Sequence, residues 1–142
     1  MPEGKHKAVQ LLGEDILVTR QNGLIRAIED RCPHRGIRFS SRPLFYTKET
    51  ITCWYHTWTF DLDDGSLRTI LSSPDSKVIG KCGVKTYPLV ETKGVIFIFV
   101  GDIDPPPLEY DLAPGFLDED AVIYCSDPYD IASNWRLGCE NG

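Results

Sequence analysis

The sequence lacks any long apolar run. Its longest uninterrupted apolar stretch, Val95 to Val100, has the length of a strand, whereas a membrane-spanning helix needs roughly 18 consecutive apolar residues. The N-terminal residues M-P-E-G-K-H-K are charged, and no apolar segment of a signal peptide stands behind them. The expectation is therefore a cytoplasmic protein without membrane contact.

The sequence also has fewer basic than acidic residues, and its number of cysteines is odd. Its formal net charge is −6, which argues against general nucleic-acid binding because phosphate contacts need a basic surface. Five cysteines do not suggest the disulfide framework of a small secreted protein. In a reducing compartment, closely spaced cysteines and histidines bind a metal more often than the cysteines form disulfides.

Helical periodicity is missing from the first hundred residues, and strand-like runs separated by turn residues take its place. Asn22-Gly23, Asp64-Gly65 and Lys93-Gly94 each join two such runs. Dipeptides of this kind are typical of hairpin turns, which need positive φ at their centre. The pattern predicts an all-β, antiparallel fold. Because V-I-F-I-F-V does not alternate, we expect that strand to be buried on both faces.

The composition changes after residue 101. Pro105-Pro106-Pro107 favours an extended polyproline II segment, and a loop-rich tail leads to S-N-W-R-L-G-C-E-N-G, where Ser133 or Asn134 could cap a helix. We expect a β domain over residues 1–101. Residues 102–142 would form a Pro-rich strap and the start of a further, truncated domain.

Two short segments carry the candidate metal ligands. R-C-P-H-R-G contains Cys32 and His34, and C-W-Y-H-T-W contains Cys53 and His56. Each segment offers one thiolate and one imidazole from a tight loop, which suits either one zinc ion or a Rieske-type 2Fe–2S cluster. C-x-H is too tight for comfortable chelation of a single ion. In a Rieske cluster each loop sends its Cys to one iron and its His to the other, so the spacing favours the cluster.

The choice of ligands determines the redox chemistry. With two thiolates and two neutral imidazoles the oxidised core has no formal charge, so adding an electron is easier than in a four-cysteine cluster. Rieske proteins of high potential carry an additional cysteine beside each ligand pair. Pro33, Arg35, Trp54 and Tyr55 stand there instead, which predicts a potential at the low end of the Rieske range.

Other residues near these segments allow two interpretations each. Trp54, Tyr55 and Trp58 could shield the cluster from water or could be ordinary core residues. Four arginines make the first loop basic, either as a docking surface for an acidic redox partner or as a solvated face; they are Arg31, Arg35, Arg38 and Arg42. The remaining cysteines have no ligand-like spacing and are interpreted as inert; they are Cys82, Cys125 and Cys139.

These motifs resemble the Rieske domain of the α subunit of ring-hydroxylating oxygenases, the Rieske non-haem iron dioxygenases. The resemblance extends over nearly the whole chain, including I-T-C-W-Y-H-T-W-T, D-P-P-P-L and S-N-W-R-L-G-C-E-N-G. It implies an antiparallel β Rieske domain, a homotrimer, and electrons supplied by a ferredoxin. The arginines around the first loop suggest that the ferredoxin would dock near Arg35 and Arg38. It also implies cluster ligands at the matching positions, which are Cys32, His34, Cys53 and His56.

The sequence departs from that family in its histidine content. A mononuclear iron of this class needs two histidines and a carboxylate, but the chain has three histidines and only His6 is not assigned to the cluster. The mononuclear iron is therefore expected only in a longer protein, in which residues 102–142 would begin the catalytic domain. We expect this chain alone to transfer electrons without hydroxylating a substrate. A free-standing Rieske ferredoxin and a zinc-stabilised interaction module are the alternatives.

Overall fold

The computed structural model describes residues 1–124 and 130–140, and these residues fall into two compact units. The first unit spans Met1–Leu112 and the second spans Ala113–Gly142. None of the helices in the described ranges has the length and apolarity of a membrane span. The boundary expected after residue 101 stays a prediction.

The first sheet is antiparallel and has the order β1 (His6–Leu11), β2 (Glu14–Gln21), β3 (Leu24–Glu29). Both of its turns have two central residues at positive φ, with Leu12 at 50° before Gly13 and Asn22 at 56° before Gly23. This geometry matches the right-handed twist of the strands. The predicted hairpin at Asn22-Gly23 is confirmed.

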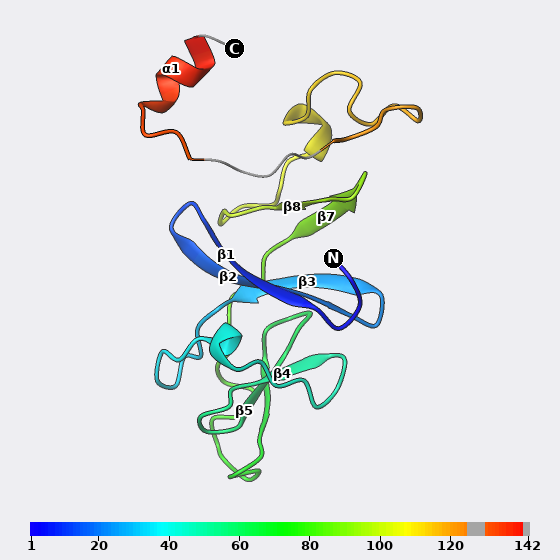
Figure 1. The fold of residues 1–142 in the computed structure, drawn as a ribbon. Helices are drawn as coiled ribbons and strands as arrows, with labels where there is room; N and C mark the ends of the chain where they lie inside the picture. Colours follow the sequence, from blue (N-terminus) through cyan, green and yellow to red (C-terminus); the bar gives the residue numbers. More distant parts are fainter. Residues whose placement is uncertain (125–129, 141–142) are drawn as a thin grey trace. The chain divides into compact units, whose positions relative to one another are not determined.

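Strands β2 and β3 of this sheet have buried residues on both faces, whereas β1 is mostly exposed. Leu17 and Ile28 pack into a core that also contains the strands below the sheet in Figure 1. Ile16 and Val18 point to the opposite face and pack in a second core with residues of the β7–β8 ribbon above it. Neighbouring strand residues alternate between faces, so the central strand β2 must be apolar at successive positions.

The second sheet contains β4 (Thr50–Thr52), β5 (Trp58–Asp61) and β6 (Leu67–Ile70), again antiparallel. The predicted hairpin around Asp64-Gly65 is present, but its loop is longer than two residues. Only Gly65 has positive φ there, because the Asp61 carboxylate accepts the backbone N–H groups of Asp63 and Asp64 and shapes a wider turn.

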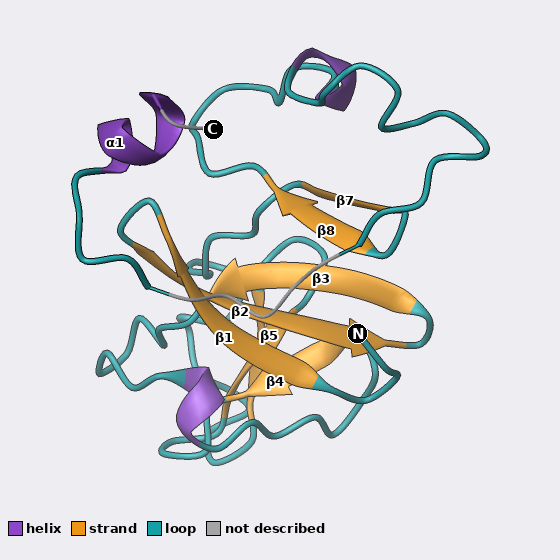
Figure 2. Ribbon diagram, turned by 45° about the horizontal axis from the view of Figure 1, so that its top comes forward, coloured by secondary structure: helices purple, strands orange, loops and turns teal. Residues whose placement is uncertain are grey.

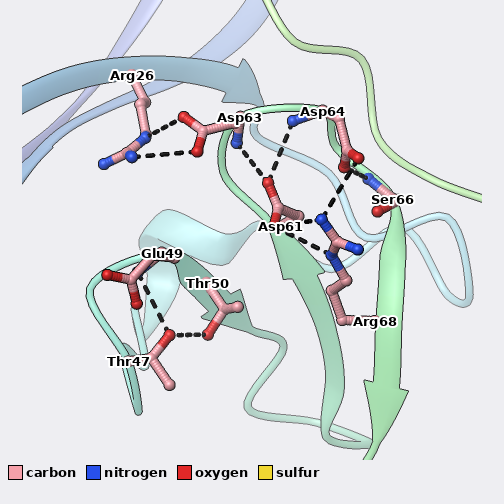
Figure 3. A network of polar contacts seen from close by, with 9 residues as sticks. All are labelled: Arg26, Thr47, Glu49, Thr50, Asp61, Asp63, Asp64, Ser66 and Arg68. Carbon is pink, nitrogen blue, oxygen red and sulfur yellow. Dashed lines mark hydrogen bonds and ion pairs between the residues drawn. The ribbon is translucent and has the colours of Figure 1, made fainter.

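Two arginines tie this wide turn to its surroundings (Figure 3). Arg26 of β3 donates from Nε and Nη2 to both carboxylate oxygens of Asp63, and Arg68 of β6 donates to Asp61. Bidentate pairs of this kind fix orientation as well as distance. The network therefore joins the first sheet to the second.

The third sheet is a ribbon of β7 (Leu89–Thr92) and β8 (Val95–Ile98), joined by a turn at Lys93-Gly94 with both residues at positive φ (Figure 2). The expectation that V-I-F-I-F-V is buried on both faces is wrong. All four β8 residues are only half-buried, because among the described strands β8 pairs only with β7 and one face packs against the second core. Overall, the all-β antiparallel fold is confirmed.

Two short 3-10 helices and one α-helix complete the described structure. These are η1 (Phe39–Ser41), η2 (Leu108–Tyr110) and α1 (Trp135–Glu140). Of the two predicted caps of α1, Ser133 and Asn134, the structure shows Asn134, whose side-chain oxygen accepts the backbone N–H of Arg136 at 3.0 Å.

Candidate metal centre

The two candidate ligand loops have the same backbone hydrogen bonds. Cys32 N–H donates to Ile37 O at 2.8 Å, and Gly36 N–H donates back to Cys32 O at 2.8 Å. In the second loop Cys53 N–H donates to Trp58 O at 2.8 Å, and Thr57 N–H donates to Cys53 O at 2.9 Å. Each loop is therefore a closed turn that begins at its cysteine and presents the next residues outward.

The residue four places after each cysteine has a left-handed conformation. Gly36 has φ 70° and Thr57 has φ 57°. A glycine adopts this conformation without cost, whereas a β-branched residue rarely does. The two loops are thus equivalent in path, although their histidines stand two and three places after the cysteine.

The two thiols lie inside the larger core. Cys32 is 1% exposed and Cys53 is 3% exposed, and both belong to the same cluster of buried residues. Burial raises the pKa of the Cys32 thiol to about 12, with a smaller contribution from Cys53, while the backbone N–H groups of His34 and Arg35 act in the opposite direction. A buried pair of thiolates therefore needs a cationic group beside it.

The two imidazoles lie together as well, nearer the surface. The ring centroids of His34 and His56 are 4.7 Å apart and the rings meet edge to face. Burial, followed by the proximity of His56, lowers the pKa of His34, and a neutral imidazole is the form that binds a metal. His34 also stacks on Trp58 with its ring centroid at 4.7 Å.

This arrangement of two sulfurs and two nitrogens fits a cluster better than a single ion. In the ranges 1–124 and 130–140, no three His, Cys, Asp or Glu side chains are grouped to hold one metal ion. Donors instead come as a thiol pair in the core and an imidazole pair at the rim. Two irons that each take two protein ligands match such a donor set.

The remaining singled-out residues are divided between core and surface. Trp58 packs against the larger core, whereas Trp54 and Tyr55 are 37% and 51% exposed. Trp54 Nε1 donates to Ser41 Oγ at 3.0 Å, which links the second loop to η1. His6 lies on β1 beside the Phe45 ring at 6.4 Å.

The structure shows the surroundings of two of the three remaining cysteines and of the four arginines of the basic loop. Cys82 is half-buried against the larger core and Cys139 is exposed, and both are free; Cys125 lies outside the described residues. Arg38 donates to Asp15 at 2.6 Å. The other three arginines are exposed and make no ion pair within the part of the chain that the structure describes; they are Arg31, Arg35 and Arg42.

Two residues at this site were not found from the sequence. Thr57 Oγ1 donates to Ser72 Oγ at 3.0 Å and accepts the Ser72 backbone N–H at 3.0 Å. The equal spacing of Gly36 and Thr57 from their cysteines is the one signal in the sequence that could have pointed to Thr57. Ser72 stands 15 residues from Thr57 and carries no local signal.

Comparison with known proteins gives consistent matches. Residues 1–88 match the family described as the Rieske [2Fe-2S] domain. Residues 99–142 match the family described as homotrimeric ring hydroxylase. The two matches cover the parts of the chain on either side of the β7–β8 ribbon.

Individual relatives point to one enzyme. Over 140 residues the chain is 52% identical to the terminal oxygenase component of carbazole 1,9a-dioxygenase from a Sphingomonas species, covering 99% of this chain and 37% of that protein. The chain therefore spans little more than a third of the length of this curated relative.

Solved structures agree with the curated relative. The terminal oxygenase of carbazole 1,9a-dioxygenase from Nocardioides aromaticivorans superimposes with a TM-score of 0.88 at 51% identity, covering 99% of this chain and 38% of that one. A reduced complex between oxygenase and ferredoxin in carbazole 1,9a-dioxygenase gives 0.91 at 49% identity, covering 100% of this chain and 36% of that one.

Proposed function

Because this chain belongs to the Rieske [2Fe-2S] domain family, we propose that it is the electron-transfer domain of an aromatic-ring-hydroxylating dioxygenase like carbazole 1,9a-dioxygenase. The family's cofactor is a 2Fe–2S cluster, which accepts and donates one electron at a time. The match of residues 99–142 to ring hydroxylases favours this function over a free-standing ferredoxin, because a small carrier needs no such extension.

The proposed cluster ligands are Cys32, His34, Cys53 and His56. One observation carries this assignment: two loops of the same backbone path bring the thiols together in the core and the imidazoles together near the surface. Burial of Cys32 and Cys53 limits solvent access to the thiols. The backbone N–H groups of His34 and Arg35 lower the pKa of the Cys32 thiol, and burial together with the proximity of His56 lowers the pKa of His34. Hydrogen bonds to sulfur and limited solvent access are the features that tune such a cluster.

The partners and the second metal are proposed for the whole protein. A ferredoxin would deliver electrons to the cluster, with Arg35 and Arg38 at its docking surface, and the assembly would be a homotrimer. A mononuclear iron would be bound by residues other than these 142, and an aromatic compound such as carbazole would be the substrate there. A cytoplasmic location and a potential at the low end of the Rieske range stay predictions.

The cluster is tested by loading the 142-residue chain with iron and sulfide under anaerobic conditions. Wild type should be red-brown with about two irons and two acid-labile sulfides per chain, and its reduced form should give a rhombic EPR signal. C53S should lose the cluster, since it removes a proposed ligand. C82S should keep it, because that cysteine lies in the same core but is not a proposed ligand.

Zinc at one equivalent per chain with no colour would contradict the proposal. A full cluster in C53S would contradict the ligand assignment while leaving the family unaffected.

A further inference from the structure

We propose that Thr57 and Ser72 form a latch that positions the second ligand loop and sets the orientation of His56 at the cluster. The inference rests on the proposed function, since it concerns how this chain holds a proposed ligand. Neither residue is itself a ligand, so each acts as a positioning residue.

The first argument is the backbone of Thr57. The other non-glycine residues at positive φ in the described ranges are Leu12, Asn22 and Lys93, and each precedes a glycine in a hairpin turn. Thr57 is β-branched and lies in a loop, followed by Trp58. Such a residue is strained at φ 57°, so something around it must hold the loop in this conformation.

The second argument is the comparison with the first loop. The equivalent residue there is Gly36, and a Cβ built at Gly36 would meet nothing within 4 Å. The turn itself therefore requires only a residue that tolerates positive φ, and glycine meets this requirement without strain. Because the second loop has a threonine at this position, its hydroxyl must contribute what a glycine cannot.

The third argument is the direction of the hydrogen bonds. Thr57 Oγ1 donates to Ser72 Oγ at 3.0 Å, Ser72 Oγ donates to the His56 carbonyl at 3.4 Å, and Ser72 N–H donates to Thr57 Oγ1 at 3.0 Å. Each hydroxyl proton thus has one acceptor, and the chain of bonds ends on the backbone of His56. Leu71 N–H adds a fourth bond, to Thr57 O at 3.2 Å.

The anchor of the latch is rigid. Ser72 lies two residues after the end of β6 (Leu67–Ile70), and β6 pairs with β5, which begins at Trp58. The second ligand loop runs from the end of β4 to the start of β5 in the same sheet, and the latch ties its last two residues, His56 and Thr57, to Ser72. His56 is held against this frame, in edge-to-face contact with His34 at 4.7 Å.

The test measures midpoint potential and EPR spectrum on the cluster-loaded chain. T57V keeps the β-branched shape without the hydroxyl, S72A removes the donor to His56, and T57S is the conservative rescue. S73A is the matched control, because Ser73 lies in the same exposed turn and its side chain takes no part in these bonds.

T57V and S72A should broaden the EPR lines, because His56 then samples several orientations. They should also raise the midpoint potential, since water that reaches a looser cluster stabilises the reduced, more negative state. T57S and S73A should match wild type in both measurements.

The experiment distinguishes a failure of the latch from a failure of the proposed function. Unchanged potential and unchanged line shape in T57V and S72A would overturn the latch, even if both variants unfold more easily. Failure of wild type itself to hold a cluster would overturn the proposed function instead. If T57V does not fold, S72A decides alone, because Ser72 is exposed and its truncation leaves the core intact.

Discussion

Tyr87 is an ionisable residue whose environment is set by a few contacts. Its side chain is 4% exposed in the second core, and its hydroxyl donates to Glu14 Oε2 at 3.0 Å. Burial first, and the bond to Glu14 second, raise the pKa of Tyr87 above its ordinary value of 10.0. Both causes favour the protonated phenol in the folded state.

This shift predicts a loss of stability in alkali. Below pH 10 Tyr87 is protonated in the folded and the unfolded chain, so its contribution is complete there. Above pH 10 the unfolded chain releases the proton while the folded chain retains it, so the free energy of unfolding falls as pH rises. Urea unfolding of the cluster-loaded chain at about pH 8 and about pH 10.5 measures this.

Y87F is the comparison. It should be less stable than wild type by about 1 kcal/mol at the lower pH, because the bond to Glu14 is lost. The difference in free energy of unfolding between wild type and Y87F should be smaller at the higher pH, because wild type loses stability there and Y87F does not lose this contribution. A difference that stays constant across this range would show that Tyr87 does not titrate as the structure implies.

Among the elements, the β5–β6 turn depends most on a single glycine. Gly65 has φ +72°, and a Cβ built there would stand 2.0 Å from the Val84 carbonyl oxygen. The backbones of Gly65 and Val84 are hydrogen-bonded in this region, with Val84 N–H donating to Gly65 O at 2.9 Å. The Val84 carbonyl oxygen belongs to the backbone, so it cannot move aside by a change of side-chain rotamer.

G65A is therefore expected to destabilise the chain strongly. We predict a loss of about 3 kcal/mol or more in the free energy of unfolding, from backbone strain and the contact with Val84 together. G94A is the matched control: Gly94 has φ +78° in another hairpin turn and open space around it, so only the backbone cost of about 1 kcal/mol applies. Equal losses in urea unfolding would contradict the role of Val84.

At the scale of the whole molecule, the charge distribution is uneven. The chain has a formal net charge of −6, yet four arginines surround the first ligand loop. Arg38 is engaged with Asp15, whereas Arg35 is exposed and makes no ion pair in the described ranges. A local basic patch on an acidic protein can steer an acidic partner to one site.

R35E should slow reduction of the cluster by an acidic ferredoxin several-fold at low ionic strength and weaken its salt dependence. K7E is the control, because it makes the same change of charge at an exposed position of β1. Stopped-flow reduction measures both variants. If R35E and K7E are slowed equally, only total charge matters and the arginines form an ordinary solvated face.

The sequence by itself determined the local features of this protein. Asn22-Gly23 and Lys93-Gly94 specified hairpins because positive φ is a property of the residues in the turn. The two Cys/His segments indicated the cluster through their spacing, which is also local. The sequence also limited the cap of α1 to Ser133 or Asn134, because a capping side chain bonds a backbone N–H only two residues further along the chain.

The tertiary structure decided which distant residues meet. Asp15 and Arg38 are 23 residues apart in the sequence and Thr57 and Ser72 are 15 apart, and no local pattern links either pair. Burial is decided in the same way, since the apolar residues Ile16, Leu17 and Val18 of β2 are buried whereas the apolar residues of β8 are only half-buried. A strand's surroundings depend on what packs on each face, and only the folded chain brings those faces together.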